Sequence, residues 1–335
     1  MIEIRKPEYL SYSAVSQFFK DRDEYFMRYL AVDRPPRAPQ GKPASVGSAF
    51  DAEVKAILYD RYYGKNYMPE KYSRDALFEK QVEPPQRDYA GPAGKHVCNA
   101  YVESGMFDRF VEVFDKAIEP PQFEFRVKEE IGGVPLLGLP DGHAILPDVE
   151  VIADWKVNGY CSKSNTSPNK GYMHCLDGYV AKKQSASNQK SHKDHTPLTF
   201  KGVPICEQYM EDYSEQWASQ LTGYGWCLGS KVGSENVIHM VHQCVAKPLH
   251  DGRGPLLRFA EFRGRTRKPF QEMLLRKYQR CWESIESGHI YYELSREESD
   301  ERCERIASRA SAVANDTSEH ADFFNNVIRP DWRGN

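Results

Sequence analysis

Amphipathic helices are predicted at both ends of the chain. Apolar residues between Val15 and Leu30 recur with a period near 3.6, which predicts one helix after an N-cap at Ser11 or Ser13. Residues 64–95 are rich in Pro, Gly and Tyr and are expected to be irregular. Further helices are predicted over residues 45–63, 96–118, 213–229, 270–287 and 296–314.

Strands are predicted in the middle of the chain. Residues 123–157 alternate between apolar and polar side chains, with turn signals at Gly132-Gly133 and Pro147-Asp148. Three antiparallel strands are therefore expected in this segment. Two later apolar segments, residues 237–241 and 256–262, predict additional strands.

A segment without clear periodicity runs from Asn158 to about Pro204 and is locally basic, with many lysines among Ser, Asn and Gly. Three interpretations stay open: a solvated surface insertion, a mobile arm that grips a nucleic-acid backbone, and a zinc knuckle. The cysteines and histidines in or beside it match no usual zinc-ligand spacing; they are Cys161, His174, Cys175, His192, His195 and Cys206.

Composition and charge restrict the protein class only loosely. A formal net charge of −3 over 335 residues does not exclude DNA, because a nucleic-acid groove needs only local positive charge. No apolar run approaches the length of a membrane span, and the N-terminus lacks the apolar core of a signal peptide. Eight cysteines without a CxxC pair favour reduced thiols. A cytoplasmic protein without a membrane partner is therefore expected.

Two aspartates carry the strongest chemical signal. Asp141 follows an apolar segment in Gly-Leu-Pro-Asp-Gly, and Asp154 lies inside Val-Ile-Ala-Asp-Trp-Lys-Val. A strand, a tight turn and a returning strand would place them side by side, with Lys156 on the strand face of Asp154. Two carboxylates beside a lysine suit Mg²⁺ and a phosphate, which is the chemistry of phosphodiester hydrolysis. The alternatives are an ordinary turn aspartate and a structural ion pair within the sheet.

The order of these residues resembles the signature of the PD-(D/E)XK nuclease superfamily, with Asp141 followed by Asp154-Trp155-Lys156. Two further segments narrow the resemblance to the RecB-like exonuclease branch, which includes CRISPR-associated and phage proteins. Residues 10–15, Leu-Ser-Tyr-Ser-Ala-Val, are similar to the opening helix of that branch. Residues 220–224, Gln-Leu-Thr-Gly-Tyr, are similar to its Gln-x-x-x-Tyr helix, so the motifs occur in family order over roughly residues 9–290.

The resemblance implies a fold and a division of the chain. The implied fold is α/β: a restriction-endonuclease-like core with a central mixed β-sheet flanked by helices, an N-terminal helical lobe and a basic insertion. The chain, residues 1–335, would form a single nuclease domain. Its parts would be a helical part over 1–120, the core over 121–157 and 205–290, a Lys-rich insertion over 158–204, and a C-terminal helix and tail over 291–335.

The resemblance also implies roles for individual residues. Asp141 and Asp154 would be metal ligands, with the main-chain carbonyl of Trp155 as a third ligand. Lys156 would stabilise charge that develops on the phosphate, or help to position the attacking water. The implied metal is Mg²⁺, and Mn²⁺ is expected to substitute for it.

Gln220 and Tyr224 would contact the DNA backbone or orient Lys156. They are one helical turn apart and therefore point to one face of the helix. The alternative is an ordinary polar helix face.

Two departures from the family pattern concern the metal sites. The family's second helix usually has a metal-binding histidine in a Gly-x-x-x-His setting, whereas here Gly47 leads to Asp51. Aspartate ligates Mg²⁺ directly, so Asp51 is expected to complete the ligand set; altered metal preference and lost activity are the alternatives. Glu53 lies nearby but should point elsewhere on the helix. No iron–sulfur cluster is expected, because the only late cysteines, Cys281 and Cys303, are widely spaced.

The function implied by the resemblance is metal-dependent hydrolysis of DNA from an end, in DNA recombination, replication or repair. The setting would be a bacterial or phage-infected cell. The alternatives are an endonuclease or nickase of the same fold, and a catalytically inert DNA-binding subunit. Single- or double-stranded DNA is the expected partner, together with a recombination or replication protein. The sequence leaves strand preference, polarity, acceptance of RNA and oligomeric state open.

Overall fold

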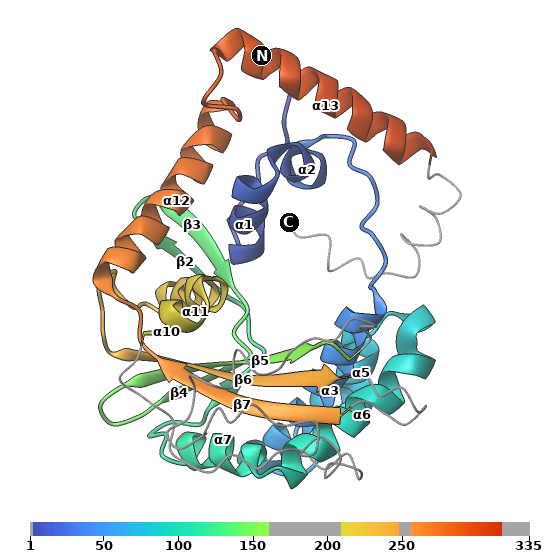
Figure 1. Cartoon of the computed structure of the whole chain (residues 1–335), viewed down its shortest axis with the longest axis vertical. Coiled ribbons are helices and arrows are strands. Elements are labelled where there is room, and N and C mark those ends of the chain that lie inside the picture. The colour runs from blue at the N-terminus through green and yellow to red at the C-terminus, as the bar shows by residue number, and fades with distance from the viewer. Residues whose placement is uncertain (1–2, 161–208, 248–255, 317–335) are drawn as a thin grey trace, which may run out of the picture.

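A mixed five-stranded β-sheet lies at the centre of the computed structural model, which describes residues 3–160, 209–247 and 256–316 (Figure 1). The strands are β1 (Gln122–Phe123), β2 (Val127–Ile131), β3 (Val134–Gly138), β4 (Gly142–Ile145), β5 (Glu150–Asn158), β6 (Val237–Lys247) and β7 (Leu256–Gly264). The sheet has the order β1-β4-β5-β6-β7, and β2 and β3 form a separate hairpin. The chain is therefore α/β with a mixed sheet, as expected.

The two neighbours of β5 decide which of its side chains share a face. β4 pairs with β5 in antiparallel orientation and β6 pairs with it in parallel orientation. Because side chains alternate along a strand, Asp154 and Lys156 lie on one face of the sheet and Trp155 lies on the other. The central position of β5 buries Asp154, which is 3% exposed.

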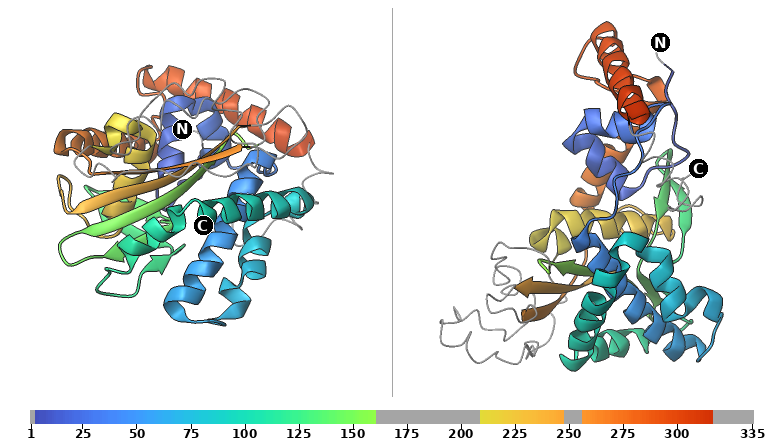
Figure 2. Two further views of the ribbon diagram at one scale, coloured as in Figure 1. Left: turned by 60° about the horizontal axis from the view of Figure 1, so that its bottom comes forward. Right: turned by 90° about the vertical axis from the view of Figure 1, so that its right-hand side faces the viewer.

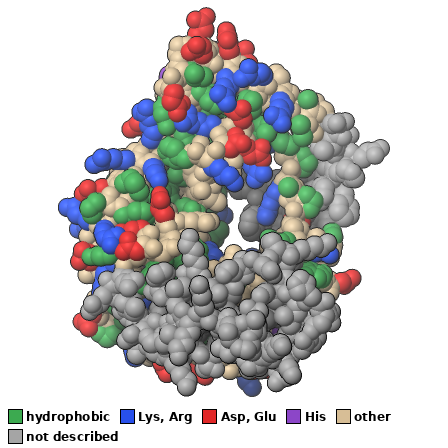
Figure 3. All heavy atoms as spheres, in the orientation of Figure 1, with side chains coloured by type: hydrophobic (Ala, Val, Ile, Leu, Met, Phe, Trp, Pro, Cys, Tyr) green, Lys and Arg blue, Asp and Glu red, His purple; other side chains and the backbone are tan. Residues whose placement is uncertain are grey.

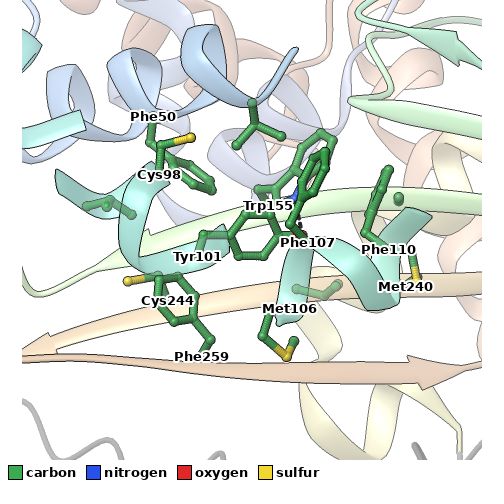
Figure 4. Close-up of a cluster of buried hydrophobic side chains, with 14 of the residues drawn as sticks. Phe50, Cys98, Tyr101, Met106, Phe107, Phe110, Trp155, Met240, Cys244 and Phe259 are labelled. Carbon is green, nitrogen blue, oxygen red and sulfur yellow. Dashed lines mark hydrogen bonds between the residues drawn. The ribbon is translucent and has the colours of Figure 1, made fainter. Parts of the chain in front are cut away.

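Helices cover both faces of the sheet. α6 (Arg87–Glu103) and α7 (Met106–Phe114) lie on one face, and α11 (Glu215–Cys227) lies on the other (Figures 1 and 2). Tyr101, Phe110 and Trp155 pack between the first pair and the strands (Figure 4). The Phe110 and Trp155 rings are 4.9 Å apart. Burial of a large apolar side chain stabilises a fold by about 1.5–3 kcal/mol. These contacts therefore hold β5 in place from the face of the sheet that α6 and α7 cover.

A helical lobe stands above the sheet and combines both ends of the described chain (Figure 1). Its elements are α1 (Tyr12–Lys20), α2 (Arg22–Tyr25), a π-helical turn η1 (Phe26–Leu30), α12 (Lys268–Ser287) and α13 (Arg296–Asp316). Phe18 and Tyr25 pack in one cluster with Cys281 and Cys303. The lobe is thus not purely N-terminal, because the last two helices supply about a third of the buried residues in its core.

The single helix predicted between Val15 and Leu30 is wrong. The backbone is extended at Asp21 (φ −158°, ψ 99°), and its side chain accepts a hydrogen bond from the Glu24 N–H at 3.0 Å. Asp21 therefore ends α1 and caps α2. The prediction of Ser11 as the N-cap of α1 is confirmed, since its hydroxyl accepts a hydrogen bond from the backbone of Ala14 at 3.3 Å.

Residues 64–95 are largely helical, which corrects the expectation of an irregular segment. They contain α4 (Pro69–Tyr72), α5 (Arg74–Gln81), the 3₁₀ turn η2 (Pro84–Gln86) and the start of α6. Pro69 and Pro84 stand in first turns, where proline starts a helix rather than ending one. The helix predicted over 96–118 is two helices, α6 and α7, separated at Gly105 with φ of 76°.

The predicted turns in the middle of the chain are confirmed. Gly132-Gly133 joins β2 to β3, and Pro147-Asp148 lies between β4 and β5. Residues 122–158 form five short strands rather than three, because the hairpin leaves the sheet and β1 adds an edge. The later strands and the last three predicted helices are present with bounds a few residues wider or narrower than expected.

α3 (Lys42–Tyr63) carries Asp51 toward the sheet and packs closely on α6. The close approach requires Gly94: a Cβ there would lie 2.5 Å from the Ala49 Cβ and 2.7 Å from the Phe50 nitrogen. Any larger residue would push the two helices apart just before Asp51. The predicted helix over residues 45–63 is confirmed and starts three residues earlier.

Figure 3 shows an opening at the place where Figure 1 has the lobe and the sheet face each other, and Lys and Arg side chains lie on the coloured part of its rim, toward the lobe. The extended segment 31–41, which joins the lobe to α3, runs along one side of this opening, opposite α11 (Figure 1). Within the described ranges, no helix combines the length and the apolar character needed to cross a membrane.

Candidate functional site

The turn between β4 and β5 brings the two predicted aspartates together. Gly142 of β4 pairs with Ala153 of β5. Because the strands are antiparallel, Asp141, which precedes Gly142, lies beside Asp154, which follows Ala153. The Trp155 N–H donates a hydrogen bond to Asp141 Oδ2 at 3.3 Å. The strand–turn–strand arrangement expected from the sequence is therefore present.

Lys156 connects this pair to α11. Its Nζ lies 2.7 Å from Asp154 Oδ2 and donates a hydrogen bond to Gln220 Oε1 at 3.0 Å. Gln220 in turn donates through Nε2 to the Tyr224 hydroxyl at 2.9 Å and to Asp154 Oδ1 at 3.4 Å. The residues predicted from the two motifs thus lie in one connected group, in which Gln220 contacts both Lys156 and Tyr224.

Asp51 reaches the same cluster through a lysine that the sequence analysis missed. Lys55, one turn further along α3, is 1% exposed. Its Nζ lies 2.6 Å from Asp51 Oδ2, 3.1 Å from Asp141 Oδ1 and 3.3 Å from Glu124 Oε2. The lysine therefore joins three carboxylates that come from three separate elements.

Glu124 is the second missed residue. Its backbone is in the left-handed region (φ 46°), and its N–H donates to the Asp141 carbonyl at 3.2 Å. A non-glycine residue in this conformation costs about 1–3 kcal/mol. Gln81 Nε2 donates to Glu124 Oε2 at 2.5 Å. A half-buried carboxylate on a strained backbone points to a role in the site, but nothing local in the Phe-Glu-Phe sequence predicts it.

The chemical signal that could have identified Lys55 is its place in α3. The segment Asp-Ala-Glu-Val-Lys puts Asp51 and Lys55 at i and i+4, on one face, next to apolar residues. A lysine on the buried face of a helix requires charged partners. Glu53, as expected, points elsewhere: Arg74 Nε donates to its Oε1 at 2.8 Å.

Burial and mutual repulsion shift the pKa values of the carboxyls. Burial raises the pKa of Asp51 to about 7; Lys55 opposes this, and Asp141 adds to it. Burial likewise raises the pKa of Asp154 to about 7, opposed by Lys156 and reinforced by Asp141. Burial also acts on Asp141, but the charges of Lys55 and Lys156 outweigh it and hold that pKa below its usual range.

Both lysines are held firmly in their charged form. Burial alone would lower the pKa of Lys55, but Asp141, Asp51 and Glu124 raise it well above its ordinary value. Burial would also lower the pKa of Lys156, but the attraction of Asp154 outweighs it and raises that pKa above its ordinary value. The cluster therefore contains two permanent cations among four carboxylates.

The donor set fits a hard divalent cation. Carboxylate oxygens are the ligands that Mg²⁺ prefers, and Asp154 Oδ2, although close to Lys156, makes no hydrogen bond. Among the described residues, no three His, Cys, Asp or Glu side chains are already arranged around a common metal position. The reason is visible in the distances: Lys55 Nζ stands between Asp51, Glu124 and Asp141.

A buried polar network supports β5 from the opposite face of the sheet. Trp155 Nε1 donates to the Tyr101 hydroxyl at 3.2 Å, and that hydroxyl lies 2.6 Å from His242 Nδ1. His242 Nε2 lies 3.1 Å from Glu261 Oε2, and Arg263 Nη2 lies 2.5 Å from Glu261 Oε1. This network fixes Trp155 and, through the backbone, the flanking Asp154 and Lys156.

Several predicted features cannot be placed. The basic insertion lies outside the described residues beyond Tyr160, and so do the cysteines and histidines considered for zinc. Cys281 and Cys303 are described; both are buried free thiols in the lobe.

No protein-family model matches the chain, and no curated protein matches it. The solved structure "Crystal structure of SSO0001" is 9% identical; the match covers 80% of this chain and 85% of that one, with a TM-score of 0.22. A TM-score this far below 0.5 carries no argument about fold or function. The functional proposal therefore depends on the residues of the site.

Proposed function

We propose that the protein is a metal-dependent deoxyribonuclease of the PD-(D/E)XK superfamily, in its RecB-like branch, and that β4, β5, β6 and α11 belong to a restriction-endonuclease-like core. The observation that carries the proposal is one chain of contacts: Asp154 forms an ion pair with Lys156, Lys156 donates a hydrogen bond to Gln220, and Gln220 donates one to Tyr224. Two motifs 64 residues apart, matched to one family on sequence alone, meet at these four side chains.

Asp141 and Asp154 would hold the metal, Mg²⁺ or Mn²⁺. When bound, such an ion lowers the pKa of a coordinated water and neutralises a phosphate. The Trp155 N–H orients the Asp141 carboxylate through its hydrogen bond to Oδ2. The Trp155 carbonyl remains the third ligand suggested by the family resemblance.

Lys156 would stabilise the negative charge that grows on the phosphate during attack. A fixed cation aimed at developing charge is among the strongest catalytic devices available to a protein. Gln220 holds the ammonium through Oε1, and the Tyr224 hydroxyl holds Gln220 in turn. These two residues of α11 therefore act as positioning residues for the lysine.

The opening between lobe and sheet supports action from a DNA end. The opening adjoins the three elements that carry the site, which are β5, α3 and α11 (Figure 1). Positive side chains lie on its rim (Figure 3). A strand that must enter an enclosed passage needs a free end, whereas an open groove admits internal sites. We therefore favour an exonuclease over an endonuclease or nickase.

A catalytically inert DNA-binding subunit is the second candidate, and Lys55 is the observation that favours it. A lysine that already pairs with three carboxylates offsets part of their negative charge and so removes part of the drive to bind a metal. Calorimetric titration with Mg²⁺ distinguishes the two functions. An inert subunit would bind DNA and show no metal site that depends on Asp141 and Asp154.

Digestion of end-labelled linear DNA tests the proposal directly. Single- and double-stranded substrates, with closed circles beside them, are incubated with Mg²⁺, Mn²⁺ or EDTA. We expect metal-dependent loss of linear DNA, intact circles, and no activity in Asp154→Ala. The matched control is Asp148→Ala, an exposed aspartate in the turn before β5. Cleavage of circles would favour an endonuclease; no cleavage with either metal by a DNA-binding wild type would favour the inert subunit.

A further inference from the structure

Lys55 occupies a position within the carboxylate cluster that a metal ion would otherwise fill. Its ammonium has three N–H groups and three carboxylate neighbours, from Asp51, Glu124 and Asp141, all within 3.3 Å. An ammonium removed from water is stable only when each of its donors has a partner. The surrounding protein supplies a partner for each of the three donors, so the ammonium of Lys55 is stable inside the cluster.

The carboxylate oxygens divide into two groups around this lysine. Lys55 contacts Oδ1 of Asp141, whereas Oδ2 faces the Trp155 N–H and the β5 side of the cluster. Asp154 lies on the β5 side, beside Lys156 and Gln220. Asp141 thus stands between Lys55 on one side and the Asp154 carboxylate of β5 on the other.

We propose that Lys55 is a resident cation that limits the site to one divalent metal ion, bound by Asp141 and Asp154. The inference rests on the proposed function and refines it. Sites with two metal ions hold them about 3.5–4 Å apart, bridged by shared carboxylates. The second ion of such a pair would have to share Asp141 and Asp51, which is where the Lys55 ammonium lies.

The charge balance agrees with a single ion. When all four carboxyls are ionised, Asp51, Glu124, Asp141 and Asp154 contribute four negative charges, and Lys55 and Lys156 contribute two positive charges. One divalent ion brings this cluster to neutrality. Lys80 adds a further positive charge at the exposed edge, 3.6 Å from Glu124, which makes a second divalent ion still less favourable.

The inference changes the role of Asp51. The sequence suggested a metal ligand in place of the family histidine, whereas the structure assigns Asp51 to the positioning of Lys55. Removing its charge should therefore change metal affinity little. Removing Lys55 should instead release Asp51, Glu124 and Asp141 Oδ1 for a second ion.

Titration with Mn²⁺ tests the inference without any reference to activity. The number of bound ions is measured by calorimetry, and electron paramagnetic resonance separates isolated ions from exchange-coupled pairs. We expect one isolated ion in the wild type and in Asp51→Asn, and a coupled pair of ions in Lys55→Met. Lys80→Met, which removes the edge lysine, is the matched control and should keep one ion.

The possible outcomes separate the inference from the proposed function. Two ions in the wild type, or one ion in a folded Lys55→Met, would overturn the role of Lys55 and leave the metal site intact. A wild type without any bound ion would overturn both. Circular dichroism establishes whether Lys55→Met is folded; if it is not, Lys55→Gln replaces it, and the wild-type stoichiometry still decides.

Discussion

Single side chains in this site do different work although they lie within one hydrogen-bonded cluster. Asp154 and Lys156 face each other across 2.7 Å, yet the carboxylate is suited to hold a metal and the ammonium to meet a phosphate. Substitutions at the two positions should therefore separate binding from catalysis. This difference is the clearest check on the roles proposed for the residues.

Lys156→Met is expected to abolish most catalysis without weakening metal binding. Loss of a fixed cation aimed at the transition state typically lowers kcat by about 10²–10³-fold. Metal affinity should stay equal or rise, because the methionine no longer competes with the ion for Asp154. Single-turnover cleavage and Mn²⁺ calorimetry measure the two quantities. Lys116→Met, at an exposed lysine after α7, provides the control, and parallel loss of both quantities would contradict the assignment.

For single side chains, the sequence predicts the placement of those that follow the local repeat of a strand or a helix. Asp154 and Lys156 share a strand face by simple alternation, and Gln220 and Tyr224 share a helix face by the helical repeat. Lys55 and Glu124 could not be placed in the same way. Their position depends on how α3 crosses the sheet and on one left-handed residue, and both are properties of the folded chain.

Among the elements, the contact of α3 with α6 decides where Asp51 and Lys55 lie. Gly94 makes that contact possible, because a Cβ would overlap the backbone of Ala49 and Phe50. The sequence gives no sign of this constraint, since a glycine inside a helix usually indicates only weakness. The same reasoning explains the missed helices after Tyr63: prolines and glycines there start helices or allow close packing.

Gly94→Ala is expected to move α3 and disturb the site from a distance. Forcing a methyl group into a tight helix contact typically costs about 1–3 kcal/mol, and the shift should weaken Mn²⁺ binding as well. Gly47→Ala on α3 is a matched control, because nothing lies within 4 Å of its added Cβ. That change should instead stabilise the helix, by up to about 1 kcal/mol. Urea unfolding and calorimetry of both variants measure the effects; equal stability of the two would contradict the packing role.

The central strand β6 is expected to make stability depend on pH. Burial lowers the pKa of His239 to about 3, so the folded protein keeps this ring neutral while the unfolded chain protonates it near 6.5. Between these values the unfolded state binds more protons, and stability therefore falls as the pH falls. The slope for one such group is about 1.4 kcal/mol per pH unit.

His239→Leu should remove this contribution. The difference in unfolding free energy between the variant and the wild type should shift in favour of the variant as the pH is lowered from 7 to 4. Urea unfolding at several pH values measures it, and other titrating groups cancel in the difference. A difference that stays constant with pH would show that His239 is not responsible.

Glu261, whose pKa is lowered to about 2 by His242 and two arginines against the effect of burial, should retain its stabilising charge throughout this range.

For the whole molecule, the segment 31–41 matters because it closes one side of the opening between lobe and sheet (Figure 1). Its end is anchored: the Gln40 N–H donates to Glu83 Oε2 at 2.7 Å, and Gln40 Nε2 donates to the Ser48 hydroxyl at 3.0 Å. The lobe is also attached independently of this segment, since β3 and α11 contribute buried residues to its core. The connection can therefore be cut without separating the two parts.

A protease site inserted after Arg37 should change which DNA is accepted. Before cleavage, single-stranded circles are expected to resist digestion because they offer no end to enter the opening. After cleavage of the segment, circles should become substrates while metal-dependent digestion of linear DNA continues at a similar rate. Gel analysis of both substrates before and after protease treatment measures this. Circles that stay intact in fully cleaved protein would show that another feature imposes the need for an end.

The buried Lys55 also has a consequence for the life of the protein before it meets any substrate. Proteins whose clustered ligands repel one another often fold only when the metal arrives. Here the carboxylates of Asp51 in α3, of Glu124 after β1 and of Asp141 before β4 have an internal counter-ion supplied by the chain itself. Synthesis and metal loading are therefore independent events. A newly made molecule can complete its structure where divalent ions are scarce and acquire its ion later, when it is needed.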